Sequence, residues 1–119
     1  MSYVYDINNY IMYKTENFEI SMQELSAFAR VLSHPARLSI LKFLASSKQC
    51  ISGDISDKIP LSRSTVSQHL KELMLAGLIQ GSVEGTRINY CLRKDTIDEM
   101  IDQFSDLFNE IKSETGHSC

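Results

Sequence analysis

The sequence has 119 residues and is 43% hydrophobic, which suffices for one folded core and is too short for two independent domains. No segment approaches the run of about 20 apolar residues that spans a membrane, and residues 1–6 lack the basic and apolar pattern of a secretory signal. The three cysteines are odd in number and far apart, unlike those of a secreted disulfide scaffold. We therefore expect a cytoplasmic protein with reduced thiols and no membrane partner.

The charge is unevenly distributed along the chain. The formal net charge is -3, which by itself disfavours binding to a polyanion. Residues 50–94, however, carry six Lys and Arg against four Asp and Glu, whereas residues 95–119 carry seven acids against one Lys. A nucleic-acid surface would therefore have to lie in the middle of the chain, with the acidic C-terminal segment pointing away from it.

The first predicted helix follows an N-terminal arm, residues 1–20, which shows no clear periodicity. Ser21 and Glu24 have the spacing of a capping box, so the helix is predicted to begin at Ser21. One face of it should be apolar, formed by Met22, Leu25, Phe28, Ala29 and Leu32.

A second helix is predicted over Pro35–Ala45, because proline is favoured in the first helical turn. Its inward side chains should be Leu38, Leu41, Phe43 and Leu44. A short strand is expected at Cys50–Ser52, and a short third helix, capped within residues 52–54, should extend through Lys58.

A fourth helix should begin after Ser62, a favourable N-cap, and end before Gly77, which can adopt the left-handed conformation of a helix terminator. Its inward residues should be Val66, Leu70, Leu73 and Met74. Two β-prone runs, residues 78–83 and 87–92, flank Glu84-Gly85-Thr86, so a β-hairpin is predicted there.

The last helix is predicted to begin with Asp95 as its N-cap. Apolar residues occupy one face and acids the other; the apolar stripe comprises Ile97, Met100, Ile101, Phe104, Leu107, Phe108 and Ile111. A stripe of this length on a terminal helix exceeds what a small core needs, so it predicts a second copy of the chain as partner.

Helix, short turn, helix and hairpin is the order of a winged helix-turn-helix, so the predicted fold is mainly α with a small β-hairpin wing. In that fold the helix after the turn enters the major groove of double-stranded DNA. The first two turns of the fourth helix carry hydroxyl, amide and basic groups that suit phosphates and base edges. The alternative is that these residues are simply a capped, solvated helix start.

Two segments carry a specific resemblance. Residues 31–41 (VLSHPARLSIL) resemble the L-x-x-P-x-R-x-x-I-L opening of the ArsR/SmtB family of bacterial repressors. Residues 61–73, 76–79 and 84–90 are similar to the recognition helix and wing of that family, and the likeness extends from about Leu25 to Leu92.

The resemblance implies a homodimeric repressor, held together by its first and last helices, that binds a palindromic operator and is released by an inducer. Residues 21–113 would form the DNA-binding and dimerisation domain, with 114–119 as a polar end. The positions that match DNA-contacting residues are Ser64, Thr65, Ser67, Gln68, His69, Lys71 and Arg87, and the basic Arg63 at the start of the same helix is added to them as a predicted DNA contact. For His69 the alternative is packing or capping within the domain.

The sequence defines the inducer less clearly than it defines the DNA-binding residues. Many family members sense metals through paired cysteines on the third helix or through Asp and His on the last, and this chain departs from both patterns, so no metal site and no cofactor are predicted. Cys50, Cys91 and Cys119 form a possible sensor for arsenite, a similar thiophile or an oxidant, if Cys50 lies on a strand beside the second wing strand. The alternative is that the cysteines are small buried hydrophobes.

Other function classes have weaker sequence support. Winged helices also serve as protein-interaction modules without direct DNA readout, which the polar and basic fourth helix disfavours. The chain contains no phosphate-binding glycine loop, nucleophile elbow or HExxH helix, so an enzyme is not predicted. Whether a DNA-binding regulator represses or activates is not decided by these motifs.

Overall fold

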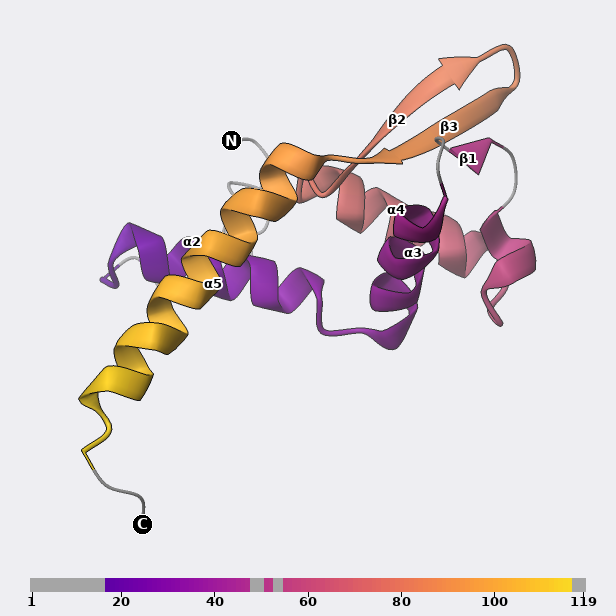
Figure 1. Ribbon diagram of the computed structural model, residues 1–119. Coiled ribbons are helices and arrows are strands. Elements are labelled where there is room, and N and C mark those ends of the chain that lie inside the picture. The colour runs from indigo at the N-terminus through magenta and orange to yellow at the C-terminus, as the bar shows by residue number, and fades with distance from the viewer. Residues whose placement is uncertain (1–16, 48–50, 53–54, 117–119) are drawn as a thin grey trace.

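The computed structural model describes residues 17–47, 51–52 and 55–116. Their helices are α2 (Ile20–Val31), α3 (Pro35–Ser46), the 3-10 helix η1 (Ile55–Lys58), α4 (Arg63–Leu75) and α5 (Lys94–Glu114). Their strands are β1 (Ile51–Ser52), β2 (Ile79–Glu84) and β3 (Arg87–Leu92). This order, with the hairpin after the α3–α4 pair, confirms a mainly helical fold with a small β-hairpin wing (Figure 1).

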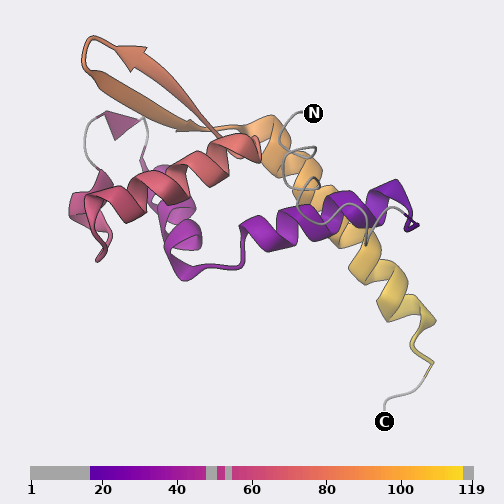
Figure 2. The same ribbon diagram turned by 180° about the vertical axis from the view of Figure 1, so that it is seen from behind.

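The elements form an elongated molecule with extents of 54 × 31 × 25 Å. The β2–β3 hairpin lies over α4 and projects beyond it, and α5 crosses α2 and continues past it at the opposite end of the molecule (Figures 1 and 2). The wing and the acidic end of α5 are therefore far apart, as the charge distribution predicts. None of the helices in the described ranges is long and apolar enough to cross a membrane.

The hydrophobic core lies between α3, α4, the end of α2 and the base of the hairpin. Its most deeply buried large side chains are Phe28, Val31, Ile40, Val66, Leu73, Leu78 and Ile79. The second half of α2 faces this core, because the three-residue spacing of Phe28 and Val31 places them on one face of the helix.

Three of the predicted helix starts have different outcomes. Ser62 is confirmed as the N-cap of α4, since its hydroxyl accepts a hydrogen bond from the backbone N–H of Thr65. Ser21 is not a cap: α2 begins one residue earlier, after Glu19, whose carbonyl accepts from the N–H of Gln23. Asp95 is likewise not the cap of α5, because that helix begins at Lys94 after Arg93. Ser21 and Asp95 both lie in the first helical turn, beyond the capping position.

Some inward-facing predictions are wrong. Leu38 is 51% exposed, because the buried face of α3 is formed by Ala36, Ile40 and Leu44. On α2, Ala27 is buried and the predicted Ala29 is exposed. The third helix is a 3-10 turn rather than an α-helix, and its predicted cap at residues 53–54 lies outside the described residues.

The three strands form an antiparallel sheet in the order β1-β3-β2. Ile51 pairs with Tyr90 and Ser52 with Asn89, while β2 and β3 pair from Ile79↔Leu92 to Glu84↔Arg87. Gly85 turns the hairpin with a positive φ of 63°, and Gly77 ends α4 with a φ of 76°, both in the region that glycine adopts without steric cost. The hairpin is thereby directed back across α4.

Candidate nucleic-acid interface

The start of α4 presents a polar surface. Six of the predicted DNA-contacting residues on this helix have exposed side chains, namely Arg63, Ser64, Thr65, Ser67, Gln68 and Lys71. The cap orders this surface: the Ser62 hydroxyl donates to Thr65 Oγ1 at 2.9 Å and lies 3.3 Å from Ser64 Oγ. The first turn therefore offers ordered hydroxyl groups and backbone N–H groups, which suit phosphate oxygens.

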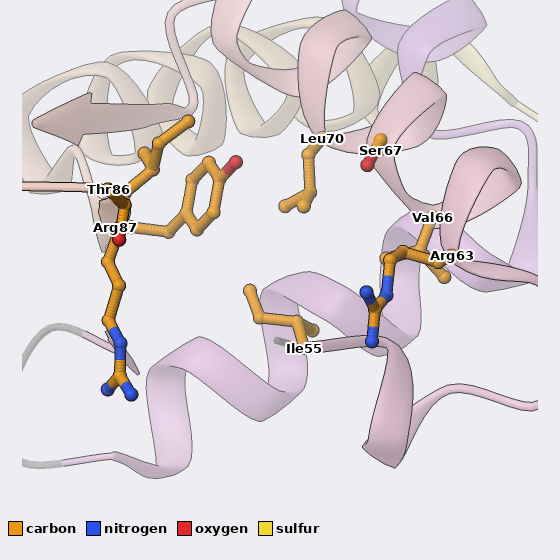
Figure 3. Close-up of a pocket in the computed structure, with 9 residues that line it drawn as sticks. Ile55, Arg63, Val66, Ser67, Leu70, Thr86 and Arg87 are labelled. Carbon is orange, nitrogen blue, oxygen red and sulfur yellow. The ribbon is translucent and has the colours of Figure 1, made fainter. Parts of the chain in front are cut away.

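A groove of about 300 Å³ separates α4 from the wing. Apolar side chains from η1, α4 and β3 line its walls, among them Ile55, Leu70 and Tyr90. Figure 3 shows Arg63 and Arg87 at opposite ends of the groove with Ile55 between them. The recognition helix and the wing thus place a guanidinium group on each side of one concave surface, a distribution that suits a polyanion.

Burial raises the pKa of the Tyr90 hydroxyl in this groove, so Tyr90 stays neutral at physiological pH. A neutral phenol adds no negative charge beside the two arginines.

The basic character of residues 50–94 is reduced where this segment meets α5. Arg93 forms an ion pair with Asp95 at 3.2 Å, and Lys94 forms one with Asp98 at 2.8 Å. The carboxylate of Asp95 also accepts from the backbone N–H of Thr96, which lowers the pKa of that carboxyl group and favours its charged form. Lys71 and Arg87 lie outside these two pairs, so they supply positive charge near the recognition helix.

The structure corrects the prediction that His69 faces the DNA groove. Its side chain is 8% exposed and its Nδ1 accepts a hydrogen bond of 3.1 Å from Arg37 Nε. The reason is visible in the spacing: position 69 is three residues after Val66 and four before Leu73, so it lies on the buried face of α4. His69 therefore packs within the domain, which is the alternative interpretation given above.

Arg37 lies near this site and was not among the predicted site residues. Besides contacting His69, it donates from Nη1 to the carbonyl of Val31 at 3.1 Å. Its position inside the segment 31–41 was a signal, but the sequence contains no information on which acceptors its guanidinium would find.

The cysteines are only partly described. Cys91 is half-buried on β3 and is disulfide-bonded, which differs from the expectation of reduced thiols. Cys50 and Cys119 lie outside the described residues. In the described part of the chain, no group of three or more His, Cys, Asp or Glu side chains could hold a metal ion.

A helix-turn-helix followed by a wing, with exposed polar and basic groups on the second helix, defines the class of winged helix-turn-helix DNA-binding regulators. Residues 34–80 match the model of the arsR family of bacterial regulatory proteins. The chain belongs to that family and is a DNA-binding transcriptional regulator. The family consists of regulators rather than enzymes, which agrees with the sequence prediction.

Two curated relatives illustrate the likeness. The HTH-type transcriptional regulator YgaV of Escherichia coli is 30% identical over 90 residues, 76% of this chain and 91% of the relative. The arsenical resistance operon repressor of Staphylococcus xylosus is 33% identical over 100 residues, 84% of this chain and 92% of the relative.

A solved structure supports the fold. The ArsR-like transcriptional regulator from Rhodococcus sp. RHA1 superimposes with a TM-score of 0.63 at 23% identity, covering 76% of this chain and 84% of that one. At this identity the likeness concerns the winged-helix fold alone.

Proposed function

We propose that the protein is a homodimeric repressor that binds a palindromic operator through α4 and the wing and leaves it when an inducer binds. The observation that carries the DNA-binding part is the groove between α4 and β3, with Arg63 and Arg87 at its two ends. The repressor part is supported by the name of the Staphylococcus xylosus relative, an operon repressor.

The exposed groups divide into two kinds of DNA contact. Gln68, which can pair bidentately with adenine, is the candidate for reading a base, with Ser64 and Ser67 beside it. Lys71 and Arg87 are candidates for phosphate contacts, which position the protein without reading sequence. Thr65 is a weaker candidate, since its hydroxyl is already hydrogen-bonded to Ser62.

The dimer is supported by the apolar faces that α2 and α5 leave uncovered. None of the 21 residues of α5 is buried, although its apolar side chains recur at helical spacing. Phe108 is 61% exposed, and Ile101 and Ile111 are also exposed, as is Ile20 at the start of α2. Apolar patches of this kind mark protein–protein interfaces, and burying one such side chain contributes about 1.5–3 kcal/mol.

A polar atom in the same region also fits a second copy. A groove of about 200 Å³ runs between α2 and α5, and Gln103 lines it. The side-chain oxygen of Gln103 is buried and accepts no hydrogen bond from the described residues. A partner chain seated on α2 and α5 would cover the apolar side chains and could donate to this oxygen.

The inducer hypothesis rests on the cysteines. Ile51 pairs with Tyr90 in antiparallel register, and in the sequence Cys50 precedes Ile51 while Cys91 follows Tyr90. Two reduced thiols in such positions could replace two hydroxyl groups of arsenite with release of two water molecules, and Cys119 would supply a third ligand. An oxidant would instead convert two thiols to a disulfide, the state in which Cys91 is found.

Fluorescence anisotropy with DNA from upstream of the gene tests the proposal. The reduced protein should bind specifically, and its affinity should fall at least about tenfold between about 50 and 200 mM salt, because phosphate contacts release counterions. Arsenite should then abolish binding by wild-type protein and leave Cys91→Ser bound, with Ser82→Ala as a control substitution on the neighbouring strand.

The outcomes separate the parts of the proposal. A salt-independent affinity, or no preference for upstream DNA, would contradict operator binding and favour a protein-interaction module. Tight binding that arsenite and peroxide both leave intact would refute the thiol sensor and retain the operator assignment.

A further inference from the structure

Arg37 connects three helices at one point. It belongs to the first turn of α3, its Nη1 donates to the carbonyl of Val31 at the end of α2, and its Nε donates to His69 Nδ1 in the middle of α4. Val31 and His69 are both buried. The guanidinium group therefore forms a polar link between α2 and the recognition helix.

His34 completes the cluster. It is the N-cap of α3, and its Nδ1 accepts from the backbone N–H of Ala36 at 3.0 Å. Its ring centroid lies 4.3 Å from that of His69, with the planes tilted by 44°. His69 therefore has an imidazole and a guanidinium group as direct neighbours, both from the start of α3.

The hydrogen bond between Arg37 and His69 is directional, whereas the apolar contacts that pack α4 are not. Val66, Leu70 and Leu73 hold α4 against the core by apolar burial, which fixes the helix position more strongly than its rotation. A hydrogen bond to His69 Nδ1 requires one orientation of the helix. Ser67 and Gln68 lie within two residues of His69 and share that orientation.

We propose that Arg37 and His69 are positioning residues for DNA binding: their hydrogen bond sets the orientation of α4 relative to α2, and protonation of His69 releases it. This inference rests on the proposed DNA-binding role of α4. Neutral His69 accepts at Nδ1 and carries its proton on Nε2. Protonated His69 carries hydrogens on both nitrogens, so it cannot accept from Arg37 and would place a second cation beside the guanidinium group.

The surroundings of His69 keep it neutral at physiological pH. Burial lowers its pKa below the usual 6.5, with further lowering from His34 and Arg37 on α3, while Glu72 on α4 acts in the opposite direction. The folded state therefore takes up this proton less readily than the unfolded chain. The stabilisation is fully present above pH 6.5 and is lost as the pH falls through the lower folded-state pKa.

Three variants test the proposal. His69→Asn keeps an acceptor near the position of Nδ1 and does not titrate, whereas Arg37→Met removes the donor. His34→Asn is the matched control, because asparagine preserves the N-cap of α3 and removes the neighbouring imidazole.

Operator affinity is measured by anisotropy at constant ionic strength from about pH 7.5 to about pH 5, the acid side of the range in which histidine changes charge, because the pKa of His69 is lowered. Wild-type protein and His34→Asn should lose about tenfold in affinity across it, as expected for breaking a hydrogen bond to a charged group. The operator affinity of His69→Asn should not fall across the same pH range. Acid otherwise makes the protein more positive and strengthens binding to DNA, so a loss in acid is opposite to the general electrostatic trend.

Nuclear magnetic resonance without DNA supplies an independent measurement. The amide signals of residues 63–71 should shift with the same midpoint as the His69 ring in wild-type protein, and should stay constant in His69→Asn. The inference would be overturned if operator affinity had the same pH profile in wild type and His69→Asn. It would also be overturned if the amide signals of α4 did not shift as His69 titrates. Loss of operator binding at every pH would instead refute the proposed function, and the amide shifts alone would then decide on the link.

Discussion

Two regions of the molecule use apolar side chains in opposite ways. The recognition region, formed by α3, η1, α4 and the wing, buries Ile40, Leu73 and Leu78 completely within one chain. The outer region, formed by residues 18–24 and α5, leaves Phe108 61% and Ile20 71% exposed. The two regions have similar apolar spacing along their helices, so periodicity alone does not distinguish a core from an interface.

The difference indicates where stability originates. The recognition region has enough buried apolar surface in one chain to hold the helix-turn-helix together. Under the proposed dimer, the outer region obtains its burial from the second copy, so its order depends on protein concentration.

The largest expected effect is in the recognition region. Leu73→Ala should lower the free energy of unfolding by about 2–5 kcal/mol, because it leaves a cavity in the fully buried core. Leu38→Ala, on the exposed face of α3, should change it by less than about 0.5 kcal/mol. Urea unfolding measures both. Equal losses for the two variants would show that the contrast between buried and exposed faces is wrong.

The outer region should respond through association. Phe108→Ala should weaken the dimer roughly thirtyfold, since a central aromatic residue at an interface contributes about 2 kcal/mol. Sedimentation equilibrium measures this, with Asn109→Ala on the polar side of α5 as control. A wild-type protein that is monomeric at micromolar concentration would contradict the assignment of this region as an interface.

The smallest effect is expected at the wing. Arg87→Ala should weaken operator binding roughly fivefold for all sequences and reduce the salt dependence by about one counterion per protomer. Lys112→Ala, on the acidic helix α5, is the charge-matched control and should leave the affinity unchanged. Anisotropy over a salt series gives both quantities, and identical slopes for wild type and Arg87→Ala would remove Arg87 from the interface.

Much of the fold follows from local signals. The cap at Ser62, the terminator at Gly77 and the turn at Gly85 locate α4 and the hairpin, because each satisfies a backbone requirement within a few residues. Ser21 and Asp95 have equally good capping chemistry and are not caps. Those two helices begin one residue before these side chains, at Ile20 and Lys94, and neither start has a side-chain cap.

The candidate site divides in the same way. Helical spacing and composition are local properties, and they predicted the exposed polar groups of α4, apart from His69, and the charge contrast with α5. The burial of His69, its hydrogen bond to Arg37, 32 residues away, and the disulfide of Cys91 depend on contacts between distant segments. A hydrogen bond between two helices depends on how their apolar faces pack, and no local pattern specifies that packing.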